Sequence, residues 1–417
     1  MNSIAISFLL INAAALLLLP RRLAALPLLA GACYMTRGQG IEVGPFHFMV
    51  LRMLIAVGLV RIMSRGERMT GGMNGLDWLM LAWALWASTS SVFHRDPWGA
   101  LVYRLGVVYD AYGIYFLIRV FCQSLDDVIG LSRLTAILLV PVAAEMVYEK
   151  LMSHNYFAVF GGVSADPYIR EGRVRANGPF AHAILAGTVG AVSGPLMVGL
   201  WRDHRFWAIA GIVASLTIVI ASTSSGPIMS SAAAVGALVM WRFRRRVHLA
   251  RWLGLAAYVA LDLYMKDPAY YIIARIDLVG GSTGWHRARL IQSSIEHISE
   301  WWFAGTDYTR HWMASGVSWS AEHTDITNHY LQMGVIGGLP LMLLFIGTLA
   351  KGFSFVGQAV RHTDDFSPHS RFVVWTLGAA LFTHAVTFIS VSYFDQSSLF
   401  IYLNLALIGS VKSGIRS

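Results

Sequence analysis

Apolar segments of membrane-spanning length recur along most of the chain. A helix needs about 20 mostly apolar residues to cross a bilayer, and thirteen segments approach that length. The first two are short and could form a re-entrant hairpin instead, which leaves twelve spans as the alternative. The pattern therefore predicts an all-α, polytopic membrane protein with about 12–13 transmembrane helices. The thirteen segments are 4–20, 22–36, 45–63, 76–93, 99–120, 131–148, 179–200, 206–223, 226–241, 249–264, 331–350, 372–391 and 394–411.

Two long polar stretches interrupt the apolar pattern. We predict residues 1–264 as transmembrane helices with an outer loop near 149–178, residues 265–330 as a long outer loop, and residues 331–417 as C-terminal transmembrane helices. Most basic residues lie in the other connections, which share one side if the spans alternate. The positive-inside rule makes that side cytoplasmic. The residues concerned are Arg21, Arg22, Arg61, Arg65, Arg68, Arg202, Arg205, Arg242, Arg244, Arg245, Arg246, Arg251, Lys351, Arg361, Arg371, Lys412 and Arg416.

Composition supports the membrane interpretation and excludes other classes. The 417 residues are 56% hydrophobic and only 13% charged, against about 25% charged in a soluble domain. A soluble globular domain, a disordered chain and a disulfide scaffold are thereby excluded. The net charge of +9 is explained by basic residues flanking apolar segments, so we expect no nucleic-acid partner. The two cysteines, Cys33 and Cys122, are interpreted as packing residues.

Charged residues also fall inside apolar segments, among them Arg52, Arg104, Asp110 and Glu145. Each costs at least about 2.5–3.5 kcal/mol at the centre of a bilayer. Arg104 and Asp110 are six residues apart, so they cannot pair at the helical spacings of three or four. Each charge is therefore expected to find a partner on another helix or to line a watery cavity.

Arginines accumulate in both outer stretches, where Arg170, Arg173 and Arg175 precede Arg275, Arg287, Arg289 and Arg310. A guanidinium group grips phosphate oxygens with two parallel hydrogen bonds and never loses its charge. The cluster therefore suits a lipid-linked phosphate or diphosphate at the membrane surface. The alternative is a set of headgroup contacts and loop ion pairs with Glu171, Asp277 and Glu296.

A polar segment rich in His and Asp runs directly into the apolar segment at 331–350. It contains His323, Asp325 and His329. Imidazole is the side chain best matched to proton transfer near neutral pH. The alternatives are an interfacial belt and a metal site, but the spacing of the three residues matches no tight metal motif. We expect neither a metal ion nor a cofactor.

The spacing in this segment resembles a known family. His323-Thr324, nine residues and Gly334-Val335-Ile336-Gly337 are similar to the motif of the O-antigen ligase and polysaccharide polymerase superfamily of bacterial inner membranes. Thr324 departs from the family, which usually has Asn, Ser or Gln there. A second register, through Asn328-His329-Tyr330-Leu331, makes His329 the reserve candidate.

Two arginine-bearing stretches add to the resemblance, which covers roughly residues 170–350. Arg175-Ala-Asn-Gly178-Pro-Phe180-Ala-His182 looks like the family's entry into a membrane span. Gly284-Trp285-His286-Arg287-Ala-Arg289-Leu290 is similar to its arginine-bearing helix. Ser225 stands where the family often has an arginine, so the role of that arginine cannot be transferred.

The resemblance implies a GT-C-like glycosyltransferase with its site on the periplasmic face of the inner membrane. The donor would be a glycan on undecaprenyl diphosphate, and the acceptor another glycan or lipid A–core. His323 would be the general base, with His329 in reserve. Arg175 and Arg287 would hold the diphosphate, with Arg289 and Arg173 as alternates. The transfer would invert the anomeric carbon without a metal.

Three interpretations of the function remain open at this stage. Polymerisation of lipid-linked polysaccharide is slightly preferred over ligation to lipid A–core, because of the departures in the histidine motif. A transporter or flippase of lipid-linked oligosaccharide would use the same arginines and need no base. A non-catalytic membrane subunit of a polysaccharide assembly system is the third. Further assembly proteins are possible partners in each case.

Overall fold

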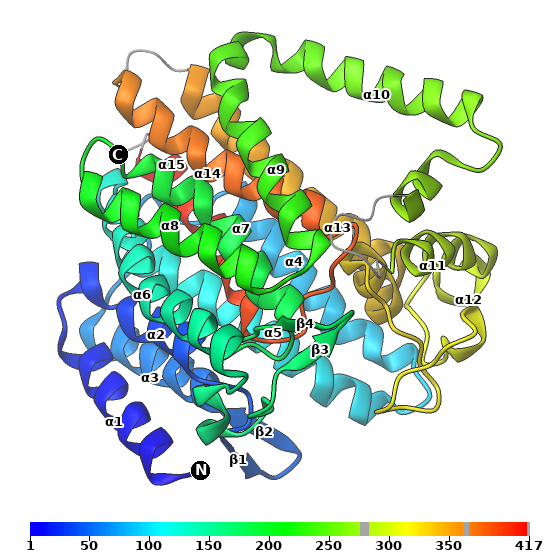
Figure 1. Ribbon diagram of the computed structural model, residues 1–417. Coiled ribbons are helices and arrows are strands. Elements are labelled where there is room, and N and C mark those ends of the chain that lie inside the picture. Colours follow the sequence, from blue (N-terminus) through cyan, green and yellow to red (C-terminus); the bar gives the residue numbers. More distant parts are fainter. Residues whose placement is uncertain (276–282, 362–366, 415–417) are drawn as a thin grey trace.

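The computed structural model describes residues 1–275, 283–361 and 367–414 and is mostly helical (Figure 1). Each of the thirteen predicted apolar segments overlaps an α-helix, and α11 and α12 lie within the predicted outer loop. The α-helices are α1 (Ser3–Leu18), α2 (Leu26–Tyr34), α3 (Val50–Arg65), α4 (Gly75–Thr89), α5 (Pro97–Phe121), α6 (Leu125–Met152), α7 (Ala183–Gly199), α8 (Arg205–Ala221), α9 (Ser225–Val239), α10 (Val247–Tyr264), α11 (Gly284–Glu296), α12 (Ile298–Trp301), α13 (His329–Arg361), α14 (Pro368–Thr387) and α15 (Leu399–Gly414). Short 3-10 helices connect them: η1 (Arg21–Leu23), η2 (Ser90–Phe93), η3 (Tyr156–Phe160), η4 (Met240–Arg246), η5 (Ala269–Arg275), η6 (Arg310–Trp312) and η7 (Gln396–Ser398).

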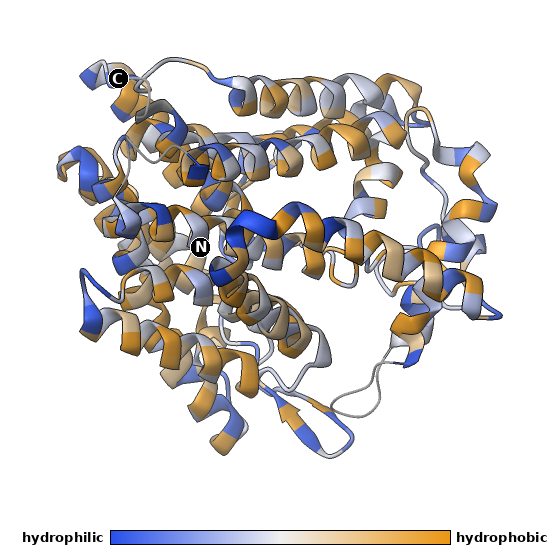
Figure 2. Ribbon diagram, turned by 90° about the horizontal axis from the view of Figure 1, so that it is seen from above, coloured by the Kyte–Doolittle hydropathy of each residue, from blue (hydrophilic) through white to orange (hydrophobic). Residues whose placement is uncertain are grey.

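Among the described residues, three helices are long and apolar enough to cross a membrane, namely α5, α6 and α13. The helices α1, α7 and α8 are apolar but shorter. Hydrophobic residues run along most of the helical ribbon, and hydrophilic ones gather mainly at helix ends and connections (Figure 2). The nine residues of α2 extend only about 14 Å, too short for a full crossing. The expectation of 12–13 crossings stays a prediction.

Two small β-hairpins depart from the all-α expectation. In the first, β1 (Gly40–Val43) pairs with β2 (Phe46–Met49), joined at Gly44 with a φ of 59°. In the second, β3 (Tyr168–Arg170) pairs with β4 (Arg173–Arg175) across Glu171 and Gly172, which both have positive φ. Two-residue turns with this backbone match the twist of a hairpin. Both hairpins lie at one end of the bundle (Figure 1).

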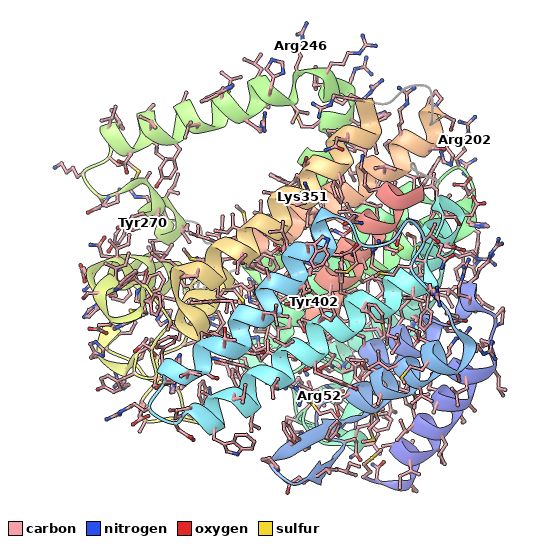
Figure 3. The ribbon with its side chains drawn as sticks, turned by 180° about the vertical axis from the view of Figure 1, so that it is seen from behind. Arg52, Arg202, Arg246, Tyr270, Lys351 and Tyr402 are labelled. Carbon is pink, nitrogen blue, oxygen red and sulfur yellow. The ribbon has the colours of Figure 1, made fainter. Side chains whose placement is uncertain are left out.

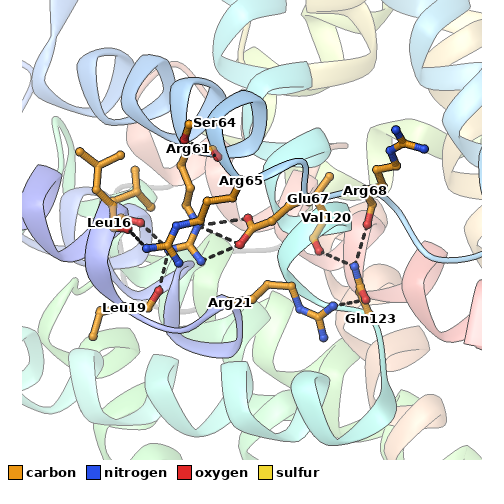
Figure 4. Close-up of polar contacts among 11 residues, drawn as sticks. Leu16, Leu19, Arg21, Arg61, Ser64, Arg65, Glu67, Arg68, Val120 and Gln123 are labelled. Carbon is orange, nitrogen blue, oxygen red and sulfur yellow. Dashed lines mark hydrogen bonds and ion pairs between the residues drawn. The ribbon is translucent and has the colours of Figure 1, made fainter.

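Buried polar contacts hold the N-terminal helices together at the end of α3. Arg61 is fully buried and its guanidinium donates to the carbonyls of Leu16 and Leu19, at 2.5 and 2.8 Å, and to Glu67 Oε1 at 2.8 Å (Figure 4). Arg21 pairs with Gln123 beside them. These contacts satisfy the last carbonyls of α1, which no further helical turn can satisfy.

The predicted intramembrane charges find partners on other elements. Arg52 on α3 binds Asp110 on α5 through two hydrogen bonds of 2.8 and 2.7 Å. The guanidinium of Arg104 contacts His94 and the carbonyl of Ile336. Pairing of this kind offsets the cost of placing a charge in an apolar layer.

A break in α13 attaches the predicted outer loop at 265–330, called the outer segment below, to the helical bundle. Gly337 and Gly338 leave helical geometry, and Gly338 has a φ of 73°. The backbone of the segment after α12 docks there: Leu339 N donates to Trp302 O at 2.7 Å, and Thr306 N donates to Val335 O at 3.0 Å. The glycine-rich motif thus permits two backbones to meet.

The outer segment has a small core of its own beside this junction. Its members are Leu290, Trp301, Trp312, Met313, Ile326 and Val335. They come from α11, α12, η6, the following loop and the start of α13. The core links the helix that carries Arg287 to the loop that carries His323.

Replacing Gly338 with alanine tests this junction. A Cβ at Gly338 would lie 2.2 Å from Phe303 O, and its positive φ is unfavourable for alanine. We expect Gly338→Ala to destabilise the protein by at least about 1–3 kcal/mol. The measurement is the unfolding midpoint in detergent. Gly347→Ala is the control on the same helix, because its nearest contact is 3.9 Å away. Equal midpoints for the two variants would contradict the tight junction.

Candidate functional site

A cavity of about 900 Å³ brings together residues from both outer segments and from the bundle. Four of the predicted site residues line it: Arg175, Arg287, His323 and His329. Arg52 of α3 and Tyr402 of α15 mark two further walls (Figure 3). Residues far apart in the sequence therefore share one chamber, as a reaction site requires.

Charge in the cavity is predominantly positive. Among the described residues, five arginines and three aspartates line it, and the Arg52–Asp110 pair is mutually neutralised. No described carboxylate lies within ion-pair distance of the remaining arginines. The lining arginines are Arg37, Arg52, Arg170, Arg175 and Arg287, and the aspartates are Asp110, Asp325 and Asp395.

The β3–β4 hairpin presents two of these arginines. Directly paired residues of an antiparallel hairpin point to the same side, as do residues two apart on one strand. Tyr168 pairs with Arg175 and Arg170 with Arg173, so these four share one face. Arg170 and Arg175 line the cavity, whereas Arg173 does not. The period-two spacing of arginines around Glu171-Gly172 is the signal that would have added Arg170 to the predicted site.

Arg175 is held in place but keeps a free donor. Its Nη2 donates to Ser224 Oγ at 2.6 Å, and its Cζ lies 5.9 Å from the centre of the Tyr168 ring. Its Nε is buried without a hydrogen-bond partner among the described residues. Burial and the nearby positive charge of Arg170 lower the pKa of Arg175. An anion in the cavity would offset both the cost of burying the charge of Arg175 and its repulsion by Arg170.

Arg287 also lines the cavity, and it resembles Arg175 in its burial and in its donor without a described partner. It lies in the first turn of α11, and its buried Nε also has no described partner. Burial and the charges of Arg170 and Arg175 lower its pKa, while Asp325 acts in the other direction. The three guanidinium groups are therefore close enough to repel one another. Asp277, a predicted loop partner, lies outside the described residues.

The two alternate arginines lie elsewhere. Arg289 pairs with Glu296 on the same helix, at 3.3 Å, as the loop ion-pair alternative predicted. Arg173 is exposed near the tip of the hairpin. Neither side chain lines the cavity.

His323 lines the cavity on a half-buried loop. Its Nδ1 shares a 2.7 Å hydrogen bond with Ser320 Oγ, and its ring packs on Trp319 with centroids 5.4 Å apart. These contacts orient the ring, and no described residue occupies Nε2. An imidazole held in this way has one nitrogen available to accept a proton.

His329 also lines the cavity but is nearly enclosed. It is 4% exposed and lies 4.6 Å from the Phe388 ring, with Phe345 and Tyr393 on its other sides. Its Nδ1 accepts from the backbone N–H of Tyr393 at 3.3 Å. A protonated imidazole is poorly accommodated among aromatic rings. The surroundings therefore favour His323 over His329 as a proton acceptor.

His182 is a cavity residue that was not among the predicted site residues. It is the N-cap of α7, where its Nδ1 accepts from Ile184 N at 3.2 Å. Burial and the charges of Arg175 and Arg170 lower its pKa to about 4. It is therefore neutral at pH 7. Its position in the motif with Arg175 was the only signal for it in the sequence.

Removing one cavity arginine should raise the pKa of His182. In Arg175→Gln a positive neighbour is lost, so protonation becomes easier and the pKa moves upward from about 4. It should remain below 6.5, because burial is the largest cause of the shift. The measurement is an NMR titration of labelled histidine. Arg173→Gln is the control and should leave His182 unchanged. An unchanged pKa in Arg175→Gln would contradict the proximity of the two groups.

Comparison of the chain with protein-family models and with curated proteins finds no match. Its function is therefore inferred from its own residues. The relevant features are an arginine-lined cavity, an oriented imidazole and apolar helices around them.

Proposed function

We propose that the protein is a membrane glycosyltransferase that extends or transfers a polysaccharide from an undecaprenyl-diphosphate-linked donor. The observation that carries the proposal is the single cavity lined by Arg175, Arg287 and His323. The similarity of the sequence to the O-antigen ligase and polysaccharide polymerase superfamily supplies the donor class. Polymerisation is preferred, and ligation to lipid A–core is the alternative.

The cationic wall suits a diphosphate leaving group. Arg170, Arg175 and Arg287 crowd together with no ion pair to a described carboxylate, and Arg175 and Arg287 keep buried Nε donors without a described partner. A diphosphate would supply the missing acceptors and the opposite charge. Because arginine stays protonated, this stabilisation requires no metal ion in the reaction.

The oriented imidazole of His323 supplies the proton acceptor. The acceptor hydroxyl attacks the anomeric carbon of the donor sugar, and its proton passes to Nε2 of His323. The bond between that carbon and the diphosphate oxygen breaks, and the electron pair leaves with the diphosphate. One displacement of this kind inverts the anomeric carbon. The guanidinium groups offset the charge that develops on the departing oxygen.

An apolar groove beside the cavity suits the prenyl chain of the donor. It measures about 530 Å³ and lies along α3, α5 and β2, with Leu59, Val108 and Phe116 among its lining residues. It shares Phe46, His47, Arg52 and Gly106 with the cavity. A lipid diphosphate needs such a pair of compartments, one polar and one apolar, whereas a free phosphate needs only the first.

The distribution of basic residues supports a periplasmic cavity in the inner membrane. Arg52 lies in the first turn of α3 and lines the cavity, whereas Arg65 ends the same helix. Arg202 and Arg246 lie toward one end of the bundle, and Arg52 lies toward the other (Figure 3). The positive-inside rule makes the end with Arg65, Arg202 and Arg246 cytoplasmic.

A flippase of lipid-linked oligosaccharide is the competing function. It would bind the same diphosphate but return the donor intact in the other leaflet. The imidazole of His323, oriented by Ser320 and open to the cavity, favours chemistry over transport.

A deletion strain distinguishes polymerase from ligase on carbohydrate gels. Single repeats on the acceptor indicate a lost polymerase, and unattached lipid-linked chains indicate a lost ligase.

His323→Ala should abolish catalysis while leaving donor binding intact. Loss of a general base typically slows a reaction by about 10²–10⁴-fold. The measurement is product formation by purified protein with a lipid-linked donor, in parallel with donor binding. His248→Ala, an exposed change on α10, is the control. Wild-type turnover in His323→Ala would refute the assignment, and loss confined to His329→Ala would transfer the role to His329.

Arg287→Ala should weaken the binding of the donor. Loss of one charge-assisted phosphate contact is expected to weaken donor binding by about tenfold or more, since such contacts contribute about 1.5–3 kcal/mol. The measurement is the KM for donor and the direct binding of undecaprenyl diphosphate. Arg289→Ala should have a smaller effect, because Arg289 pairs with Glu296 away from the cavity. Arg251→Ala on α10 is the control, and unchanged donor affinity in Arg287→Ala would contradict the proposed phosphate site.

A further inference from the structure

A second cluster of chemically capable side chains lies outside the reaction cavity. It consists of His297 at the α11–α12 junction, Glu300 in α12 and His311 in η6. One ligand atom from each residue lies within 4.8 Å of the others. None of the three lines the cavity. We propose that these residues bind a zinc ion, which fastens α12 to η6.

Local structure brings the three residues together. His297 and Glu300 are three residues apart across one helical turn, so their side chains lie on the same face. His311 arrives from η6, eleven residues further along the chain. Trp312 anchors that segment, because its Nε1 donates to Glu300 Oε2 at 3.1 Å and its ring belongs to the small outer core.

The imidazole of His297 is oriented for metal binding. Its Nδ1 lies 2.8 Å from the backbone carbonyl of Ser293. A carbonyl can only accept, so Nδ1 must be the donor, and Nε2 of the neutral ring keeps its lone pair. Metal-binding histidines almost always make this second hydrogen bond, which fixes both the tautomer and the direction of the ring.

The other two ligands are also supported by neighbours. Glu300 accepts from His311 Nε2 at 3.0 Å. Both carboxylate oxygens of Glu300 accept hydrogen bonds, one from His311 and one from Trp312. Tyr308 stacks on the His311 ring with centroids 4.8 Å apart. Zinc would replace the proton shared by His311 and Glu300.

The donor set selects the type of ion. Two imidazoles and one carboxylate suit zinc, with water in the fourth position of a tetrahedron, whereas calcium and magnesium prefer oxygen donors throughout. The side chains of His311 and Glu300 are 34% and 36% exposed, so the ion has a route from solvent. The expectation of no metal rested on the spacing of His323, Asp325 and His329; His311 lies eleven residues beyond Glu300, too far to complete a recognisable motif with it.

A zinc ion here would act on structure and not on the reaction. It would join the end of α11, which carries Arg287, to the segment that leads from η6 to His323. The donor and acceptor sugars would not touch it. Zinc binding is also independent of the proposed glycosyltransferase activity, because it can be measured without any donor.

The test measures zinc binding by the full chain in detergent, purified with a tag that lacks histidine and stripped with a chelator. Wild type should bind about one zinc ion per chain in competition with a chromophoric indicator. His297→Ala and His311→Ala should weaken that affinity by at least about tenfold. His248→Ala is the matched control for surface histidines and should bind like wild type.

A second measurement separates loss of the site from loss of the fold. Zinc should raise the unfolding midpoint of wild type and His248→Ala but not that of Glu300→Gln, which keeps the size of the side chain but has one acceptor oxygen instead of two. Absence of zinc binding by wild type would overturn the proposal. Equal affinities for wild type, His297→Ala and His311→Ala would overturn it as well.

Discussion

Mutual repulsion among guanidinium groups is the constraint on which the site depends. Arg170, Arg175 and Arg287 are brought together by a hairpin and a helix; none of them forms an ion pair with a described carboxylate, and Asp325 offsets only part of the repulsion on Arg287. A protein that needed only a stable fold would pair such charges or expose them to water. The lowered pKa values of Arg175 and Arg287, with their buried Nε donors that lack a described partner, describe a site that is completed by an anion. Under the proposed function, this anion is the diphosphate of the lipid-linked donor.

Contacts elsewhere in the molecule hold these mutually repelling arginines in place. The glycine break in α13 lets the backbone after α12 dock directly on the bundle, and Trp301 and Trp312 fill the space beneath it. On the other side Ser224 holds the guanidinium of Arg175. The two outer segments are therefore fixed independently, and the cavity between them is a consequence of both attachments.

Much of this could be predicted from the sequence, and the remainder depends on tertiary contacts. The length of the apolar segments located most of the helices. Charge placement identified the arginines of the two predicted outer loops, and the motifs that resemble the family singled out Arg175 and Arg287. The motif spacing placed His323 ahead of His329; both line the cavity, and the deeper burial of His329 favours the same order. The partner of Asp110 could not be predicted, because only the tertiary structure shows that α3 and α5 are neighbours.

The β-hairpins were missed for a different reason. Strands of three or four residues carry too little alternation to compete with the surrounding apolar helical pattern. That omission removed Arg170 from the predicted site, although Arg170 shares a face with Arg175. A short polar segment with arginines at alternate positions around a glycine turn should therefore be examined for a hairpin before its charges are interpreted one by one.

The most direct measurement is an electron cryo-microscopy structure with a non-transferable, phosphonate-linked analogue of the lipid donor. The account predicts diphosphate density between Arg175 and Arg287, the prenyl chain leaving along α3 and α5, and the first sugar facing His323. Density for the diphosphate outside this cavity, or at the end of the bundle that carries Arg202 and Arg246, would contradict it.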